Sequence, residues 1–312
     1  MAGVVAQIIF KSKPDDPAGS EAAWTNPRPE KVASETTASM PWAYLRLPPF
    51  PQVAVRVLQL VSNENVQLHE LCDLVSSDPA FASEVLTVAN SALYAPRYPA
   101  SSILQAIAVL GADTLHGMCI TVGVRAYLGK SMSQPVMRAL WRHCVATGIT
   151  AQKLAEDGMV DKYTAYTAGI LHDIGRIALS VIQPKAYAAL LGSYHGPAGS
   201  ILDCEREIFG CDHCEAGLRL VAGWNLPQEF GEVVLDHHAP RRTDGAWGLS
   251  ELVKMSCVLA DSAGYPSFAG CEASPYGELL EKLPARERRL FYPEVEALTR
   301  DIAAGISAIE SL

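Results

Sequence analysis

The chain has 312 residues, enough to bury a sizeable core in one large domain or two small ones. Hydrophobic residues make up 49% of it and charged residues only 19%, which excludes a chain that is disordered throughout. The formal net charge of −9 argues against a protein whose main task is to coat nucleic acid or an anionic membrane, because either partner favours a basic surface.

The cysteine usage and the hydropathy pattern indicate a cytoplasmic protein with reduced thiols. The eight cysteines are scattered through a chain that is large enough to fold without disulfides. Residues 1–10 are apolar but lack the basic leader and cleavage site of a signal peptide. Charged residues or glycines interrupt every apolar stretch well before the roughly 18 residues that a membrane span needs, so we expect no membrane partner.

The chain is predicted to have three parts. Residues 1–40 are rich in Pro, Ser, Thr and Ala without an apolar period, which indicates a flexible N-terminal extension. Helical patterns begin near residue 45 and continue to the C-terminus. The Gly- and Ser-containing stretch 129–135 divides them into an N-terminal helical bundle, residues 41–130, and a larger helical domain, residues 131–312.

The helices of the bundle are predicted from apolar residues at i, i+3, i+4 and i+7. Ala54, Val57, Leu58 and Val61 follow this spacing, and a second helix repeats it from Leu68 to Val75. Asp78 followed by Pro79 is typical of a helix N-cap with proline at the first helical position. Two further helices are expected over 101–110 and 113–128, separated by Gly111.

The second half of the chain also reads as helical. The expected helices span 135–156, 164–182, 185–191, 200–209, 213–222, 229–236, 249–264 and 293–312. We find no pair of strand patterns joined by a hairpin turn and no regular repeat. The predicted fold class is therefore all-α, with the N-terminal bundle packed on the larger helical domain.

Histidines and aspartates occur in a suggestive order in the second half: His143, His172, Asp173, His213, His237, His238 and Asp261. Imidazole nitrogens and carboxylate oxygens together suit divalent Fe, Mn, Ni or Zn. Two ions that share a bridging carboxylate are a common device for activating water against a phosphoester. Each histidine alone is more often a core or surface residue, so the prediction of one or two ions rests on the joint pattern.

Other features have competing interpretations. Cys211 and Cys214 could belong to a zinc knuckle, but we favour small apolar residues beside a histidine because no second Cys-x-x-Cys completes the site. The helix predicted over 81–94 could be a recognition helix for DNA, but it has no Lys or Arg to contact phosphates, which favours packing or partner docking. Arg241 and Arg242 could clamp a nucleotide phosphate, or simply form an exposed basic corner.

The stretch AGILHDIGRIAL resembles the HD superfamily of metal-dependent phosphohydrolases. LPPFPQVAVRVLQLVSNENVQLHELCDLVSSDPAFASEVLTVANSALY, SSILQAIAVLGADTL, CEREIFGCDHCEAGLRLVAGWNLP and VLDHHAP are similar to the HDOD (HD-related output domain) family of bacterial signalling proteins. This resemblance runs from about residue 45 to 264 and implies an HD-like fold for the larger domain.

The resemblance also implies roles for individual residues. The metal pattern falls on the seven His and Asp positions given above, with Asp173 as the bridging carboxylate. Arg176 stands where related cyclic-di-GMP phosphodiesterases have a lysine, so a phosphate contact is expected of it. The Gly-Tyr-Pro signature of those enzymes is missing after His238, and Ala139 stands where a third-metal carboxylate could come from.

Two functions of different classes follow as hypotheses. The first is a regulatory protein that binds a divalent metal and acts through a signalling protein partner or a nucleotide ligand. The second is an active metal-dependent phosphohydrolase or phosphodiesterase, with Asp173 and Arg176 as catalytic residues and Arg176, Arg241 and Arg242 as substrate-binding residues. A DNA-binding bundle is a weaker third reading, and we expect no nucleic-acid partner.

Overall fold

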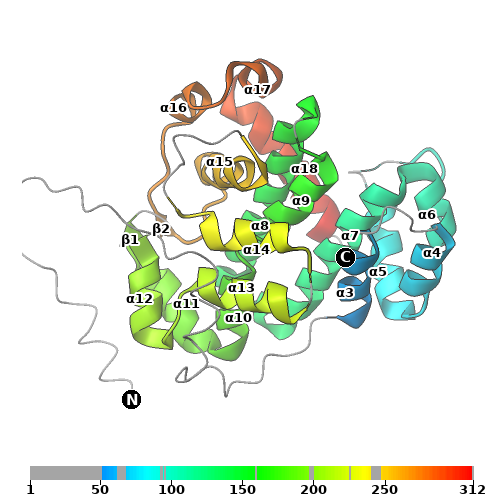
Figure 1. Cartoon of the computed structure of the whole chain (residues 1–312), viewed down its shortest axis with the longest axis horizontal. Coiled ribbons are helices and arrows are strands. Elements are labelled where there is room, and N and C mark those ends of the chain that lie inside the picture. The colour runs from blue at the N-terminus through cyan, green and yellow to red at the C-terminus, as the bar shows by residue number, and fades with distance from the viewer. Residues whose placement is uncertain are drawn as a thin grey trace, which may run out of the picture. The chain divides into compact units, whose positions relative to one another are not determined.

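The computed structural model describes residues 51–61, 68–91, 94, 96–158, 160–196, 200–224, 226–239 and 247–310. The predicted extension at 1–40 and the predicted phosphate contacts Arg241 and Arg242 lie outside these described residues. The chain is helical almost throughout the described ranges (Figure 1), so the prediction of an all-α fold is confirmed. Within these ranges we find no helix whose length and hydropathy would let it span a bilayer.

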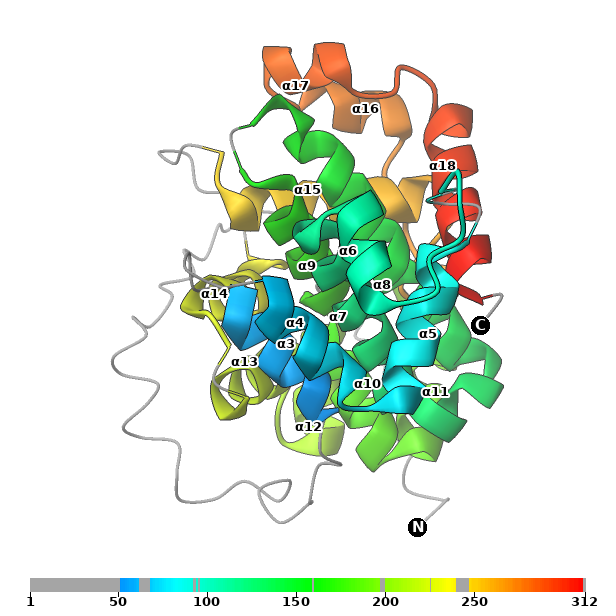
Figure 2. The same cartoon turned by 90° about the vertical axis from the view of Figure 1, so that its right-hand side faces the viewer.

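The N-terminal helices pack around one another as a bundle, coloured blue to cyan-green in Figures 1 and 2. α7 lies against α3, α5 and α6 and continues into contact with α9. The cap expected at Asp78 is present, because its side chain accepts hydrogen bonds from the backbone N–H groups of Ala80 and Phe81. The elements of this part are α3 (Gln52–Val61), α4 (Leu68–Ser76), α5 (Pro79–Ala89), α6 (Ile103–Leu110), α7 (Ala112–Leu128) and the short 3-10 helix η2 (Gly129–Ser133).

The remaining helices are arranged around α8 (Pro135–Leu154), which packs against α9 (Lys162–Leu171), α15 (Leu249–Ser262) and α18 (Val295–Glu310). A second group of neighbours consists of α10 (Ile174–Ile182), α13 (His213–Gly223) and α14 (Gln228–Asp236), in which α13 contacts both others. The other elements are η3 (Ala155–Asp157), α11 (Pro184–Ser193), β1 (His195–Gly196), α12 (Ile201–Phe209), β2 (Gly270–Cys271), α16 (Tyr276–Glu281) and α17 (Ala285–Leu290).

Most predicted helices are found within a few residues of their expected ends. The single helix expected over 164–182 is wrong, because the chain breaks at Asp173 into α9 and α10. Asp173 has φ −101° and ψ 20°, so the α-helical hydrogen-bond ladder does not pass through it. The short helices α16 and α17 were not expected. The two-residue parallel pair β1–β2 also goes beyond the sequence prediction, although it is no hairpin.

Two glycines explain why the chain breaks at this point. A Cβ on Gly169 would lie 2.6 Å from Cα of Gly148, so α9 approaches the backbone of α8 very closely. A Cβ on Gly175 would lie 1.8 Å from the carbonyl oxygen of His213, so α10 approaches the start of α13 equally closely. The turn between them therefore lets successive segments dock against two different helices, with His172 and Asp173 at the junction.

Candidate metal centre

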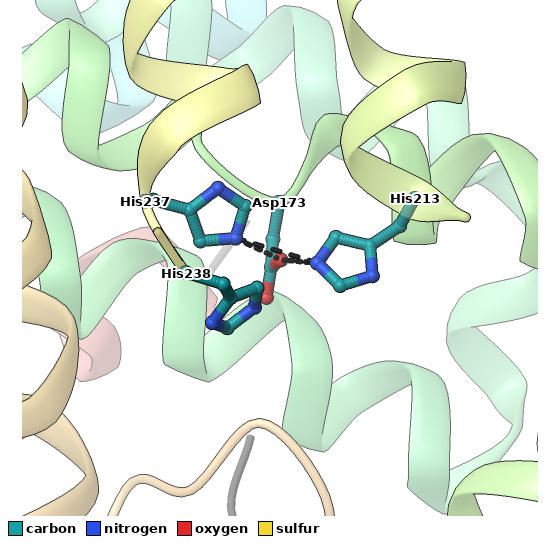
Figure 3. A group of neighbouring side chains, drawn as sticks. All are labelled: Asp173, His213, His237 and His238. Carbon is teal, nitrogen blue, oxygen red and sulfur yellow. Dashed lines mark hydrogen bonds and ion pairs between the residues drawn. The ribbon is translucent and has the colours of Figure 1, made fainter. Parts of the chain in front are cut away.

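Four segments of the chain bring six of the seven predicted ligands together in the interior. His143 lies in the middle of α8, His172 and Asp173 join α9 to α10, and His213 is the first residue of α13. His237 and His238 follow the last residue of α14. Figure 3 shows Asp173 between the rings of His213, His237 and His238.

The two oxygens of Asp173 face different pairs of histidines. Oδ1 lies 3.4 Å from Nε2 of His213 and 3.3 Å from Nε2 of His237. Oδ2 lies 3.6 Å from Nε2 of His172 and 3.9 Å from Nε2 of His143. We therefore distinguish an inner half of the centre, formed by His143 and His172, from an outer half, formed by His213, His237 and His238. Asp173 lies between the two halves, where a bridging carboxylate is expected.

The Nδ1 atoms of these rings are held by acceptors on the outside of the cluster. Nδ1 of His143 donates to the carbonyl of Tyr265 at 2.8 Å, and Nδ1 of His172 donates to its own helix at Gly169 O, 2.7 Å away. Nδ1 of His237 donates in the same way to Val234 O at 2.8 Å. Since a carbonyl oxygen only accepts, these Nδ1 atoms carry a proton, and each ring turns its Nε2 atom inward. Metal-binding histidines are commonly oriented in this way.

The inward-facing Nε2 atoms form two close pairs, one in each half of the centre, where a cation could bind. Nε2 of His143 lies 3.2 Å from Nε2 of His172, and Nε2 of His213 lies 3.3 Å from Nε2 of His237. Burial lowers the pKa of His172 and of His213, so both rings are neutral near pH 7. Two ring nitrogens therefore face each other in each half, next to one oxygen of Asp173. This donor set fits a divalent ion in either half.

Arg176 provides a positive charge inside the same cluster. Its Nε donates to Oδ1 of Asp173 at 2.9 Å, and Nη2 lies 3.4 Å from Nε2 of His238. The side chain is completely buried, with its guanidinium over the ring of Phe268. Burial alone would raise the pKa of Asp173, but Arg176 and the surrounding histidines hold it well below its usual range. Asp173 is therefore a carboxylate, and the guanidinium is its internal counter-ion.

Glu205 is a residue of this cluster that the sequence reasoning missed. Its Oε2 accepts hydrogen bonds from both the backbone N–H and Nδ1 of His213, at 2.8 and 2.6 Å, while Oε1 accepts from Tyr187 at 2.7 Å. His213 lowers the pKa of this carboxylate against the opposing effect of burial. The sequence did contain a signal, since Glu205 lies between Ile201 and Phe209 on the apolar stripe of α12, and an acid there needs a buried partner.

Asp261 is brought near the centre but on its far side. Its Oδ1 lies 3.3 Å from Nδ1 of His143, the ring nitrogen that points away from His172. The same carboxylate accepts from the backbone N–H of Ser267. The side chain that does reach Nε2 of His143 is Cys257, one turn earlier on α15, with Sγ 3.5 Å away. The structure therefore groups five of the expected ligands, all histidines, around Asp173, leaves Asp261 on the far side of His143 and adds a thiol.

Cys211 and Cys214, which could have belonged to a zinc knuckle, lie at the start of α13. Asp212 caps α13 by accepting from the backbone N–H of Glu215, and this places Cys211 and Cys214 on buried sides of the turn. Sγ of Cys214 is 4.0 Å from Nδ1 of His237, the nitrogen that already donates to Val234. Neither cysteine joins a group of three ligand atoms among the residues that the structure describes.

A surface pocket of about 480 Å³ lies behind the inner half of the centre. Arg138, Ala139 and Arg142 of α8 line one wall, and Tyr265 and Phe268 after α15 line another. Tyr265 also supplies the carbonyl that orients His143, and the ring of Phe268 lies beneath Arg176. The pocket and the centre thus share two residues.

Comparison with known proteins finds relatives in sequence and in structure. A protein of Treponema pallidum (strain Nichols) whose function is uncharacterised is 25% identical over 219 residues, which cover 68% of this chain. The chain spans only about two fifths of that relative's length, since the match covers 42% of it.

Several solved structures share the fold. An HDOD domain protein of unknown function from Geobacter sulfurreducens aligns with a TM-score of 0.62 at 23% identity, covering 85% of this chain and 92% of the other. A chain from Shewanella amazonensis SB2B, named as a candidate phosphohydrolase, gives 0.60 at 21%, covering 85% and 95%. A longer chain from Marinobacter aquaeolei VT8, named as a candidate signal transduction protein, gives 0.65 at 22%, covering 87% and 61%.

A family model extends this likeness to the sequence itself. The model of the HDOD domain matches residues 47–240, which run from the start of the bundle through the histidine pair after α14. With the helical architecture and the central His-Asp junction, this match establishes that the chain belongs to the HDOD family.

Proposed function

We propose that this protein is a regulatory HDOD module that holds a divalent metal ion in a closed site and acts by binding a signalling partner or a nucleotide. The observation that carries the proposal is the position of Arg176. Its guanidinium lies against both Oδ1 of Asp173 and Nε2 of His238, and none of its surface is exposed.

This position bears on what else the centre could bind. A substrate phosphate or a second ion in the outer half would need the same oxygen of Asp173 that Arg176 contacts. Displacing the guanidinium would leave it buried without its main counter-charge, which is costly. The exposed fractions of Asp173 and His237 are 1% and 3%, so solvent reaches these two side chains poorly, while His238 is partly exposed. We therefore interpret Arg176 as an internal counter-ion of Asp173.

The metal would be held by His143, His172 and Asp173 in the inner half, where no guanidinium competes for Oδ2. Fe, Mn, Ni and Zn suit such a donor set. A bound divalent ion supplies Lewis acidity, and here it would also cross-link α8, α9 and α10. The residues of the chain contribute orientation: Tyr265 and Gly169 fix the two rings, and Asp261 lies against the outer edge of His143.

The shared pocket supports a route for regulation. A ligand between Arg138 and Tyr265 would contact the loop that orients His143, and the arginine would attract a phosphate. The Marinobacter structure is named as a candidate signal transduction protein, which agrees with this role. The nature of the partner and the boundary between the bundle and the larger domain stay predictions.

An active metal-dependent phosphohydrolase is the second candidate. The observation in its favour is that each oxygen of Asp173 faces its own pair of histidines, as a bridging ligand of two ions would. The Shewanella structure is named as a candidate phosphohydrolase. In this case Arg176 would have to leave Asp173 and contact the substrate phosphate.

Metal analysis combined with turnover measurements distinguishes the two. The full chain is purified, its metal content is measured, and it is assayed with Mn, Fe, Ni and Zn on nucleotides, cyclic nucleotides and cyclic dinucleotides. We expect a bound divalent ion and no turnover above that of the Asp173→Asn variant. The matched control is Asp203→Asn, which changes an exposed acid on α12. Metal-dependent turnover that Asp173→Asn abolishes and Asp203→Asn retains would establish the hydrolase instead.

A further inference from the structure

Cys257 contacts a ring nitrogen of the candidate ligand His143, although the family pattern assigns no metal ligand to this position. Its Sγ lies 3.5 Å from Nε2 of His143. Sγ and one ring nitrogen each of His143 and His172 all lie within 4.8 Å of one another, and all three residues are buried. The thiol of Cys257 therefore lies beside the inward-facing ring nitrogens of the inner half.

We propose that Cys257 is a thiolate ligand of the ion in the inner half, in the place that the sequence pattern assigns to Asp261. This inference rests on the proposed metal site and specifies its donor set. The inner half would offer two imidazole nitrogens, one carboxylate oxygen of Asp173 and one sulfur. The outer half would offer three imidazole nitrogens and one oxygen.

The two faces of the His143 ring support this assignment. Asp261 and the carbonyl of Tyr265 both lie at Nδ1, the protonated nitrogen. Cys257 lies at Nε2, the nitrogen that faces His172 and Asp173. An ion bound to Nε2 would therefore have the sulfur beside it and the carboxylate of Asp261 on the opposite side of the ring. Asp261 is then a positioning residue for His143.

Cys214 provides an internal comparison. It is equally buried and also lies beside a ligand histidine, with Sγ 4.0 Å from His237. The nitrogen that it faces is Nδ1, which is already bonded to Val234. Proximity of a cysteine to a histidine is therefore common to both halves, while access to an inward-facing Nε2 atom distinguishes Cys257.

A thiolate changes which metals the centre selects. Soft sulfur ligands favour Zn²⁺ and Co²⁺ over Mn²⁺ and Mg²⁺, which prefer oxygen donors. We therefore expect the site that binds the first ion of each chain to prefer Zn²⁺ or Co²⁺ over Mn²⁺ or Mg²⁺. When Cys257 is replaced by serine, we expect the ratio of the Zn²⁺ affinity to the Mn²⁺ affinity to fall by about tenfold or more.

The test uses cobalt as the probe. The full chain is stripped with a chelator and titrated with Co²⁺ up to one equivalent, while the visible ligand-field bands and the near-ultraviolet thiolate-to-cobalt charge-transfer band are recorded. We expect both sets of bands in the wild type and in Cys214→Ser. In Cys257→Ser we expect the visible bands to persist and the charge-transfer band to be lost.

The outcomes separate this inference from the proposal on which it rests. Failure of the wild type to bind Co²⁺ or Zn²⁺ at all would overturn the metal site itself. Binding with visible bands but without a charge-transfer band, or with one that survives in Cys257→Ser, would overturn only the role of Cys257. X-ray absorption of the zinc-loaded wild type needs no variant, and a sulfur scatterer at about 2.3 Å is expected. A shell made only of nitrogen and oxygen would contradict the inference.

Discussion

Nε of Arg176 lies 2.9 Å from Oδ1 of Asp173, and this contact is made between two side chains that are 0% and 1% exposed. The pair is three residues apart across the first turn of α10, so the break at Asp173 and the start of the helix fix its geometry. Nη1 of Arg176 has an ion pair with Glu205 at 3.8 Å but no hydrogen-bond acceptor among the described residues. The guanidinium therefore depends mainly on Asp173 for its stabilisation.

Removing the charge of Asp173 is expected to destabilise the metal-free protein strongly. Asp173→Asn keeps the shape of the side chain but leaves a buried guanidinium without its main counter-ion. Breaking a buried pair in this way costs about 3–5 kcal/mol. The free energy of unfolding, measured by urea titration of chelator-treated protein, should fall by that amount.

The exposed pair of Arg142 and Glu310 is the control for this prediction. Its members are 47% and 26% exposed, although two hydrogen bonds join them. Glu310→Gln should cost no more than about 1 kcal/mol, because solvent screens the interaction. If Asp173→Asn cost no more than Glu310→Gln, Arg176 would not depend on Asp173.

Replacing Glu205 tests which half of the centre holds the ion, because Glu205 supports His213 of the outer half and, among the described residues, hydrogen-bonds to neither histidine of the inner half. Glu205→Gln takes away the negative charge that holds His213 and puts an amide donor near a donating ring nitrogen or the Tyr187 hydroxyl. Loss of such a supporting carboxylate typically lowers metal affinity about 10- to 100-fold. Because the proposed ion lies in the inner half, we expect Glu205→Gln to bind it with nearly wild-type affinity, as measured by competition with a chromogenic chelator.

Glu215→Gln is the matched control, since Glu215 is only partly buried and pairs with Arg206 on the surface. That variant should bind metal with unchanged affinity. A loss of affinity that is confined to Glu205→Gln would place the ion at His213 in the outer half and contradict the inner-half assignment.

The sequence predicted that the candidate His and Asp ligands gather at one site, because their order along the chain follows the order of the helices in the HDOD family. The same pattern did not show which face of each helix they occupy. Asp261 and Cys257 are one turn apart on α15, yet they lie at opposite nitrogens of His143. A small difference in how α15 rotates against α8 decides between them, and spacing alone does not report it.

The break at Asp173 had a similar cause. The apolar period of 164–182 continues through the junction, so the sequence predicts one helix. What interrupts it is the close approach of Gly169 to α8 and of Gly175 to α13, which is a tertiary contact. Glu205 was missed because its partner, His213, lies on another helix.

His116 is expected to make stability depend on pH independently of the metal centre. It is 5% exposed on α7, and burial lowers its pKa from 6.5 to about 4, partly opposed by Asp161. The unfolded chain therefore binds one more proton than the folded chain between these values. Stability is lost as the pH falls below 6.5, by about 1.4 kcal/mol per pH unit from this residue.

The comparison of wild type with His116→Leu isolates this contribution from that of the other histidines. The unfolding free energy of the leucine variant minus that of the wild type should be about 2 kcal/mol more positive at pH 5 than at pH 8. Urea titrations of chelator-treated protein at both pH values provide the measurement. Differences that are the same at pH 5 and pH 8 would show that His116 takes up its proton equally in both states.

Gly175 is expected to tolerate no side chain, because a Cβ there would lie 1.8 Å from the carbonyl oxygen of His213 and 2.7 Å from the backbone nitrogen of Gly217. Gly175→Ala must push α10 away from α13, which should cost about 1–3 kcal/mol or more and displace His213. The control is Gly192→Ala, at an exposed position of α11 where a Cβ meets no atom within 4 Å. This change should stabilise the protein by about 0.5–1 kcal/mol, since alanine favours helix. Thermal unfolding and Co²⁺ titration of both variants measure the effects, and a Gly175→Ala protein as stable as wild type would contradict the close packing of these two helices.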